Sequence, residues 1–261
     1  MKRFLLSILA LSLIFLATGC GKEKEIKNQL EQIIERDYIV VAVKADSKPF
    51  GFINKKTGAN EGFDIDIAKE IAIDIFGNER KIKFVPVTTG EKIEAITSGK
   101  VDIAVATFTI TPQRQYLIDF SNPYYIAGQS AVVKKNSNIH HFTDLKNKTT
   151  VVVLGSTSEQ NLRRILPMAR LSGYKNYEEA FAAFKEGQAD AISTDNTILS
   201  GFLIDNKNYR MLKNKISQEP YAVGMKRNEN DESLKKSVNM TINRIQRDGT
   251  LIKLRKKWKV N

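Results

Sequence analysis

The chain has little cysteine and little histidine, two residue types that build disulfide bridges, zinc sites and many catalytic centres. Its 261 residues include one cysteine and two histidines. With a single cysteine no internal disulfide can form, so an exported fold would depend on packing alone. His140 and His141 are adjacent in a polar loop, whereas zinc-binding pairs are normally separated by intervening residues. No serine or cysteine nucleophile has a base at a suitable spacing, so we expect no metal, no cofactor and no enzymatic activity.

The sequence also lacks an apolar run long enough to cross a bilayer. The longest run, residues 4–17, is too short for a transmembrane helix. It follows two basic residues and precedes small residues next to Cys20, a pattern that predicts a secretion signal over residues 1–19. The segment resembles a lipobox, although Leu16 stands one place early. We therefore expect a lipid anchor on Cys20 and a location on the extracellular face of the cell membrane; the alternative is a plain signal peptide with an incidental cysteine.

Acidic residues are fewer than basic ones. The chain carries 41 Lys and Arg against 29 Asp and Glu, a net charge of +12. Removal of Lys2 and Arg3 with the signal leaves 12 − 2, or +10, on the mature chain. A basic surface suits an anionic envelope or anionic ligands. The chain has no zinc-finger spacing, no arginine-rich run and no aromatic RNA-binding pattern, so we expect no nucleic-acid partner.

Strands alternate with helices along the chain, and one unit occurs twice. Residues 99–107 and residues 187–195 each begin with Gly-x-x-Asp, continue as an apolar strand and end in a polar turn. The alternation favours α/β architecture with parallel sheets, and two copies of the unit favour two lobes. We expect a two-lobed α/β protein in which each lobe is a mostly parallel sheet flanked by helices.

The first polar turn has the residues of a carboxylate-binding site. It joins a strand at residues 101–106 to a helix that Pro112 opens, because proline suits the first helical position. Thr111 is placed to cap this helix, and Arg114 lies in its first turn. Arginine binds a carboxylate through two parallel hydrogen bonds, and a helix start favours negative charge. The alternative is an arginine in a surface ion pair beside an ordinary turn.

The second polar turn offers a charge of the opposite sign. Asp195 follows the second strand, as Arg114 follows the first. Ser156 and Glu159 form a capping-box pattern, which predicts another helix start with free N–H donors. In open α/β sheets ligands bind beyond the carboxyl ends of the strands, so both turns would face one cleft. A guanidinium on one wall and a carboxylate on the other match the two charged groups of a free amino acid.

Two motifs resemble those of a known family. Residues 62–67 read Gly-Phe-Asp-Ile-Asp-Ile, followed by aliphatic residues at helical spacing. Residues 107–125 carry the second motif, and the run Ala-Thr-Phe-Thr-Ile-Thr-Pro at residues 106–112 resembles one branch of the same family. From about residue 38 onward, the chain resembles the extracellular solute-binding proteins of polar amino-acid ABC transporters, family 3, and within it the aspartate/glutamate-binding branch. The resemblance implies a hinged, periplasmic-binding-protein-like clamp with a membrane permease as its partner, and we expect a monomer.

The resemblance also implies how the chain divides. A tether would join the lipid anchor to the first lobe, and two crossings between the lobes would form the hinge. The expected segments are a tether at 20–37, a first lobe at 38–124 and 226–261, a second lobe at 127–221, and crossings near 124–128 and 221–225.

By family position, five residues would hold the charged groups of the amino acid. Arg114 would bind the α-carboxylate, assisted by Thr109 and by the backbone of Thr157 at the second helix start. Thr107 and Asp195 would bind the α-ammonium. The ligand would be captured by closure of the lobes.

The side-chain end of the cleft is less constrained by the motifs. Phe50 would form a wall, and Tyr221 would border the cleft. Lys92 stands where the aspartate/glutamate-binding branch places a cation, often arginine, and Lys44 occupies a second cleft position. Two cations would neutralise a side-chain carboxylate, which predicts glutamate or aspartate. Lysine lacks the paired donors of arginine, so glutamine, cysteine and cystine remain open.

Two other functions are compatible with the same fold. Some exported dehydratases that act on prephenate or arogenate resemble this chain in fold, but their chemistry needs a general acid in the cleft. Glu61, Glu91 and Glu159 are candidates for this acid, but no motif in the sequence indicates that any of them has the role. An adhesin or a sensor built on the same clamp is a further alternative.

Overall fold

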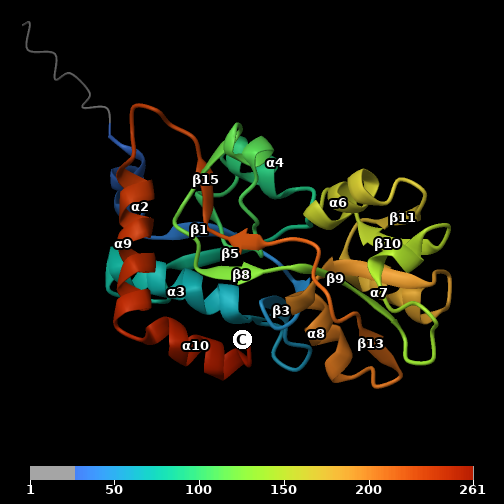
Figure 1. Cartoon of the computed structure of the whole chain (residues 1–261). Helices are drawn as coiled ribbons and strands as arrows, with labels where there is room; N and C mark the ends of the chain where they lie inside the picture. The colour runs from blue at the N-terminus through green and yellow to red at the C-terminus, as the bar shows by residue number, and fades with distance from the viewer. Residues whose placement is uncertain (1–26, 261) are drawn as a thin grey trace, which may run out of the picture.

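Two mixed α/β sheets, each covered by helices, form two lobes that lie side by side (Figure 1). The structure is a computed structural model, and it describes residues 27–260. The predicted two-lobed α/β clamp is confirmed, although each sheet is mixed rather than mostly parallel, with two parallel and two antiparallel pairings. The predicted signal at residues 1–19 and the predicted lipidation site, Cys20, lie outside the described residues. Within residues 27–260, none of the helices has the length and apolar character needed to cross a membrane.

The first lobe is built around a five-stranded sheet in the order β5, β1, β6, β15, β7. β1 pairs in parallel with β5 and β6, whereas β15 runs antiparallel to β6 and β7. β1 reads Ile-Val-Val-Ala-Val and is buried along most of its length, as a parallel strand covered on both faces should be. The strands are β1 (Ile39–Val43), β5 (Ile82–Pro86), β6 (Ile103–Ala104), β7 (Ile118–Phe120) and β15 (Gly224–Lys226).

The alternation of side chains along β1 separates the two cores of this lobe. Val41 and Val43 pack with α3 and α9, whereas Ala42 packs on the opposite face with α4. α2 and α10 pack against α9 at the outer edge of the lobe (Figure 1). The helices are α2 (Gln29–Arg36), α3 (Phe63–Phe76), α4 (Lys92–Thr97), α5 (Pro112–Gln115), α9 (Ser233–Arg247) and α10 (Thr250–Trp258).

The second lobe repeats the plan of the first. Its sheet has the order β11, β10, β12, β9, β13, with parallel pairing around β10 and antiparallel pairing of β9 with β12 and β13. The strands are β9 (Gln129–Lys134), β10 (Thr149–Val153), β11 (Arg170–Tyr174), β12 (Ala191–Asp195) and β13 (Tyr209–Met211). The helices are α6 (Thr157–Ile165), α7 (Tyr177–Lys185) and α8 (Asn196–Ile204), with a 3₁₀ turn at Phe142–Leu145.

The repeated Gly-x-x-Asp unit has a structural role in both lobes. Asp102 precedes β6 and accepts the backbone N–H of Val40 at 2.7 Å. Asp190 precedes β12 and accepts the N–H of Thr149 at 2.9 Å. Each carboxylate therefore ties the strand that follows it to the start of its parallel neighbour. The repeat places β6 and β12 at the same position in the two sheets, so the polar turns that follow them are structurally equivalent.

A two-stranded antiparallel ladder connects the lobes. β8 (Tyr125–Ala127) pairs with β14 (Glu219–Tyr221), and the chain crosses between the lobes along both strands. A small sheet of β2 (Asp46–Ser47), β3 (Gly51–Ile53) and β4 (Asn60–Glu61) lies in the first lobe near the second. Tyr125 and Tyr221, both on the connecting strands, pack their rings against Phe50 at 5.2 and 5.6 Å.

Candidate ligand site between the lobes

A small polar cavity of about 10 Å³ lies between the lobes. Each lobe contributes side chains, and nearly all of them carry hydroxyl or charged groups. The first lobe contributes Thr89, Lys92, Thr107, Thr109 and Arg114; the second contributes Ser156, Thr157, Ser158, Tyr177, Thr194 and Asp195. Six of the nine residues predicted to bind ligand thus line one cavity. Lys44, Phe50 and Tyr221 are not among the lining residues.

Arg114 is held in place by the local structure that its sequence predicts. Thr111 caps α5 by accepting the N–H of Arg114 at 3.2 Å, and Pro112 is the first helical residue. The guanidinium donates to the carbonyl of Thr109 at 2.8 Å and to that of Gly155, across the cleft, at 3.3 Å. These two contacts leave other N–H groups of the guanidinium available to a ligand. Burial lowers the pKa of Arg114, while the nearby Asp195 carboxylate acts in the opposite direction.

The start of α6 forms the facing wall of the cavity. Ser156 caps the helix by accepting the N–H of Glu159 at 3.1 Å, and Glu159 accepts the N–H of Gly155 at 2.9 Å. Thr157 and Ser158 therefore lie in the first turn, where backbone N–H groups have no helical acceptor. The N-terminal end of a helix favours an anion. This wall and Arg114 together suit a carboxylate.

Asp195 ends β12 and carries a buried carboxylate that is only half satisfied. The hydroxyl of Tyr221 donates to Oδ2, whereas Oδ1 has no hydrogen-bond partner within residues 27–260. Burial raises the pKa of Asp195 to about 7, and the Glu219 carboxylate adds to the rise. A cation at Oδ1 would supply the missing donor and favour the ionised form. Tyr221 thus contacts the site through Asp195 rather than by lining the cavity.

Asp64 lies directly behind the cavity and fixes the backbone of Thr107. Its carboxylate accepts the N–H of Thr107 at 2.7 Å and the hydroxyl of Tyr124 at 2.9 Å. Thr107 has a φ of 45°, a left-handed conformation that is costly for a β-branched residue. Burial raises the pKa of Asp64 to about 6. The motif at residues 62–67 therefore supports the cavity through a buried carboxylate.

The two predicted lysines have different environments. Lys92 lines the cavity, donates to the carbonyl of Ala106 at 3.3 Å and lies 4.6 Å from the ring centroid of Phe108. Burial lowers its pKa well below the ordinary value, and the charge of Arg114 adds to this effect. Lys44 lies outside the cavity lining and forms a buried ion pair with Asp46 at 3.1 Å. Lys44 therefore already has an anionic partner.

Several lining residues were not predicted from the sequence. Tyr177 begins α7, and its hydroxyl bonds to Thr194 Oγ1 at 2.6 Å. Thr89 accepts a hydrogen bond from Lys44 at 3.3 Å. Ser156 and Ser158 flank the predicted Thr157, so the run of hydroxyl-bearing residues could have indicated that these serines also line the cavity. Thr194 stands next to Asp195 at the end of β12.

Close contacts hold the lobes together around the cavity. Asp46 of the first lobe accepts the N–H of Tyr177, at the start of α7, at 2.9 Å. A Cβ on Gly201 would lie 2.1 Å from the carbonyl oxygen of Lys48 in the other lobe. A Cβ on Gly155 would lie 3.1 Å from Gly90 Cα. The described conformation is therefore one in which the lobes are closed on each other.

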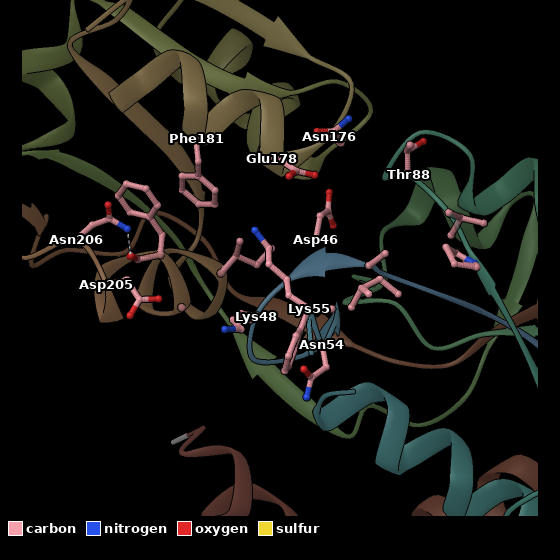
Figure 2. A pocket seen from close by; sticks show the side chains of 18 of the residues that line it. Asp46, Lys48, Asn54, Lys55, Thr88, Asn176, Glu178, Phe181, Asp205 and Asn206 are labelled. Atoms are coloured by element: carbon pink, nitrogen blue, oxygen red, sulfur yellow. Dashed lines mark hydrogen bonds between the residues drawn. The ribbon is translucent and has the colours of Figure 1, made fainter. Parts of the chain in front are cut away.

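A larger open groove of about 1140 Å³ lies beside the contact between Asp46 and α7. Figure 2 shows Asp46 facing the start of α7, where Asn176 and Glu178 lie. Its charged side chains are mixed in sign, with Lys48 and Lys55 opposite Glu178. The small cavity, in contrast, places one guanidinium and one half-satisfied carboxylate on opposite lobes. Within residues 27–260 no three His, Cys, Asp or Glu side chains are grouped so as to hold a metal ion.

Comparison with known proteins agrees with this geometry. The chain is 41% identical over 267 aligned residues to the ABC transporter glutamine-binding protein GlnH of Bacillus subtilis, covering 98% of this chain and 97% of that protein. It is 41% identical to the glutamine-binding protein of Geobacillus stearothermophilus, covering 84% and 90%. The structure of the cysteine-binding protein of Campylobacter jejuni superposes with a TM-score of 0.85 at 33% identity, covering 89% and 93%.

The family assignment follows from the length of the match. Residues 39–261 match the family described as bacterial extracellular solute-binding proteins, family 3. The match spans both sheets, the connecting strands and every residue that lines the cavity. The chain belongs to the bacterial extracellular solute-binding proteins of family 3.

Proposed function

We propose that this chain is the substrate-binding component of an ABC importer and that its ligand is free glutamine. The observation that carries the proposal is the cavity in which Arg114 and Asp195 face each other from different lobes. Relatives that are 41% identical are described as glutamine-binding proteins. The prediction of glutamate or aspartate stays a prediction, and the charges of the site argue against it.

The charged ends of an amino acid would pair with opposite lobes. The α-carboxylate would lie between the Arg114 guanidinium and the N-terminal turn of α6, where Thr157 lies. Arginine binds carboxylates through paired hydrogen bonds that fix the orientation of the ligand. The α-ammonium would donate to Asp195 Oδ1, the atom that has no partner within the described chain. Thr107 and Thr109 line the cavity beside these groups.

The balance of buried charge favours a ligand whose side chain is neutral. Two cations, Lys92 and Arg114, and one carboxylate, Asp195, line the cavity, and four more charged groups that are buried or partly buried lie near them. The cations are Lys44, Lys92 and Arg114, and the carboxylates are Asp46, Asp64, Asp195 and Glu219. A glutamine zwitterion leaves this balance unchanged. A glutamate side chain would add a buried anion that Lys92 would have to neutralise, and burial lowers the pKa of Lys92 well below its ordinary value. Lys92 would then contact the amide oxygen of glutamine.

Capture would occur by closure of the lobes. A ligand closes a protein only to the extent that it makes extra contacts in the closed state. Here Arg114 and Asp195 lie on different lobes, so both ends of the ligand are paired only when the lobes meet. The antiparallel ladder of β8 and β14 is the connection across which the lobes would move. The closed form would then dock on a membrane permease.

The remaining features of the proposal concern location and activity. We infer that residues 1–19 are a signal peptide and that Cys20 anchors the mature chain, as a monomer, to the extracellular face of the cell membrane. We also infer that the chain binds its ligand without transforming it, since both relatives are named as binding proteins.

Calorimetry with free amino acids tests the proposal. Glutamine is expected to bind more tightly than glutamate, aspartate, cysteine or cystine. A micromolar affinity would correspond to roughly −8 kcal/mol. Arg114→Ala should weaken binding by about thirtyfold or more, since truncating one partner of a buried charge pair costs about 2–5 kcal/mol. Arg163→Ala is the matched control, because Arg163 is exposed on α6 and pairs with Glu159. Tighter binding of glutamate would refute the proposed specificity, and unchanged affinity in Arg114→Ala would refute the site.

A further inference from the structure

The net positive charge of the chain is concentrated at its C-terminal end. Residues 226–261 contain 11 Lys and Arg against 4 Asp and Glu, a net charge of +7 out of +12 for the whole chain. Residues 38–124, which complete the same lobe, contain 11 of each sign and are neutral. The lobe therefore has a charge asymmetry that its ligand site does not explain.

Helix α10 is the centre of this asymmetry. Residues 250–259 contain five cations and no acidic residue. Lys253, Lys256 and Lys259 are exposed, and none of them forms an ion pair within the described part of the chain. Ile252 is 56% exposed and lies within one turn of Lys253 and Lys256. The inward face holds Leu251, which is buried against α9 and α3. α10 is thus an amphipathic helix whose outer face carries lysines and one large apolar side chain.

Two cations that lie toward the body of the lobe are paired with carboxylates. Arg244 of α9 is paired with Glu70 and Asp74. Lys257 of α10 is paired with Asp66 on α3. These pairs neutralise the cations that face the body of the lobe. Lys253, Lys256 and Lys259, in contrast, are exposed and have no ion pair within the described residues.

We propose that the outer face of α10 is a contact surface for the anionic phospholipid headgroups of the membrane. Lysines near an anionic bilayer each contribute about a factor of five to binding, provided they lie within a Debye length of the surface. Exposed apolar side chains on such a helix enter the headgroup region. A lysine face with an exposed isoleucine has both parts of this chemistry.

The position of α10 relative to the chain's N-terminal end permits this contact. α2 lies beside α9 (Figure 1), and the N–H groups of Gln29 and Leu30 donate to Asp231 and Ser233 at the start of α9. The nine residues from Cys20 to Gln29 can span at most about 32 Å. α9 has 15 residues and is about 22 Å long, so α10, which follows it, lies within that reach of a membrane anchor at Cys20.

Vesicle binding by a chain that begins at Gly21 tests the surface without the lipid anchor. All four hydrophobic clusters are built from residues 30–260, so this chain keeps the described fold. Sedimentation with phosphatidylcholine vesicles, with and without phosphatidylglycerol, measures binding. We expect binding to the anionic vesicles only, and weaker binding as salt is raised.

Two triple variants with the same change in net charge separate this surface from a general effect of charge. Replacement of Lys253, Lys256 and Lys259 by glutamine should lower binding to anionic vesicles about a hundredfold. Replacement of three exposed lysines of the second lobe should change binding to anionic vesicles less than threefold, because salt screens surface charges that lie far from the contact. The control lysines are Lys185, Lys207 and Lys213.

The outcomes are distinct from those of the proposed function. Glutamine should raise the melting temperature of both triple variants as much as that of the parent chain, because neither set lines the cavity. Loss of binding only in the α10 variant supports the surface. Equal loss in both variants, equal binding to neutral vesicles, or no binding to anionic vesicles would each overturn it, whatever the ligand proves to be.

Discussion

Replacement of Asp195 by asparagine is expected to close the empty protein while abolishing ligand binding. In the closed lobes this carboxylate is 5% exposed, and burial raises its pKa to about 7 from an ordinary 3.8. With the lobes apart the carboxylate would be hydrated. At about 1.4 kcal/mol per pKa unit, the difference opposes closure by about 4 kcal/mol while the group is ionised. A neutral asparagine of the same shape removes this cost.

The sign of the effect predicts how closure depends on pH. Because the pKa is raised in the closed state, closed lobes bind the proton more tightly than open lobes do. The closed state is therefore favoured fully below pH 3.8, and the advantage is lost as the pH rises through about 7. Empty wild-type protein should close progressively as the pH falls from about 8 to about 5, whereas Asp195→Asn should stay closed throughout. At neutral pH, a ligand ammonium at Oδ1 takes the place of the proton.

Energy transfer between dyes on the two lobes measures this closure. The dyes are attached to cysteines introduced at Lys100 and Lys185, in a chain whose Cys20 is replaced by serine. Empty Asp195→Asn at pH about 8 should give the transfer that wild type gives only with ligand, and calorimetry should detect no binding. Glu186→Gln, an exposed carboxylate of the second lobe, is the control and should behave as wild type. An empty variant that is as open as wild type would refute the reasoning.

Three further substitutions test the surroundings of the cavity. Asp64→Asn removes an ionised hydrogen-bond acceptor behind the cavity and should weaken ligand binding about tenfold; Asp66→Asn, away from the cavity, should leave the affinity measured by calorimetry unchanged, and equal effects would contradict the role. Gly201→Ala places a Cβ 2.1 Å from the Lys48 carbonyl oxygen of the other lobe, so the ligand should raise the melting temperature of this variant less than that of wild type. In the empty protein the alanine should stabilise α8 by about 1 kcal/mol. An undiminished rise in melting temperature with ligand would show that the lobes need not approach so closely. Lys92→Arg keeps its charge when buried and offers paired donors, so the ratio of glutamate to glutamine affinity should rise, and a constant ratio would exclude contact with the ligand side chain.

The charged half of the site was predictable because its residues belong to continuous motifs. Thr111, Pro112 and Arg114 lie close together in the sequence, at the start of one helix. The structure forms α5 at Pro112–Gln115, with Thr111 as its cap. Ser156 and Glu159 likewise predicted the start of α6. Capping depends on residues three or four apart, so a single sequence contains the information needed.

The other half of the site depends on which segments meet across the cleft. Tyr177 begins a segment with the pattern of an amphipathic helix, and nothing nearby in the sequence indicates that its hydroxyl reaches Thr194. Lys44 was expected to face the ligand, but it pairs with Asp46. Lys44 and Asp46 are opposite charges only two residues apart in the sequence, which was an available signal for the ion pair.

Some helices and strands were not predicted correctly because more than one of their faces is buried. α8 (Asn196–Ile204) packs Ile198, Leu199 and Phe202 into the core of the second lobe, and Gly201 meets the first lobe. A helix that is buried on several faces has no strong helical period of apolar residues. Residues 221–225 form one apolar run in the sequence, yet the run spans the end of β14 and the start of β15, which belong to different sheets.

The division of charge between the lobes links recognition to closure. Arg114 follows β6 and Asp195 follows β12, and these strands hold the same place in two sheets of the same order. If both charges lay on one lobe, a zwitterion would be fully paired without any movement, and closure would gain nothing from it. With one charge on each lobe, the second ion pair forms only when the lobes meet, so its free energy is available for closure alone. The half-satisfied carboxylate of Asp195 acts in the same direction, because it opposes closure until a cation arrives. A permease that recognises the closed form would therefore meet a loaded protein far more often than an empty one.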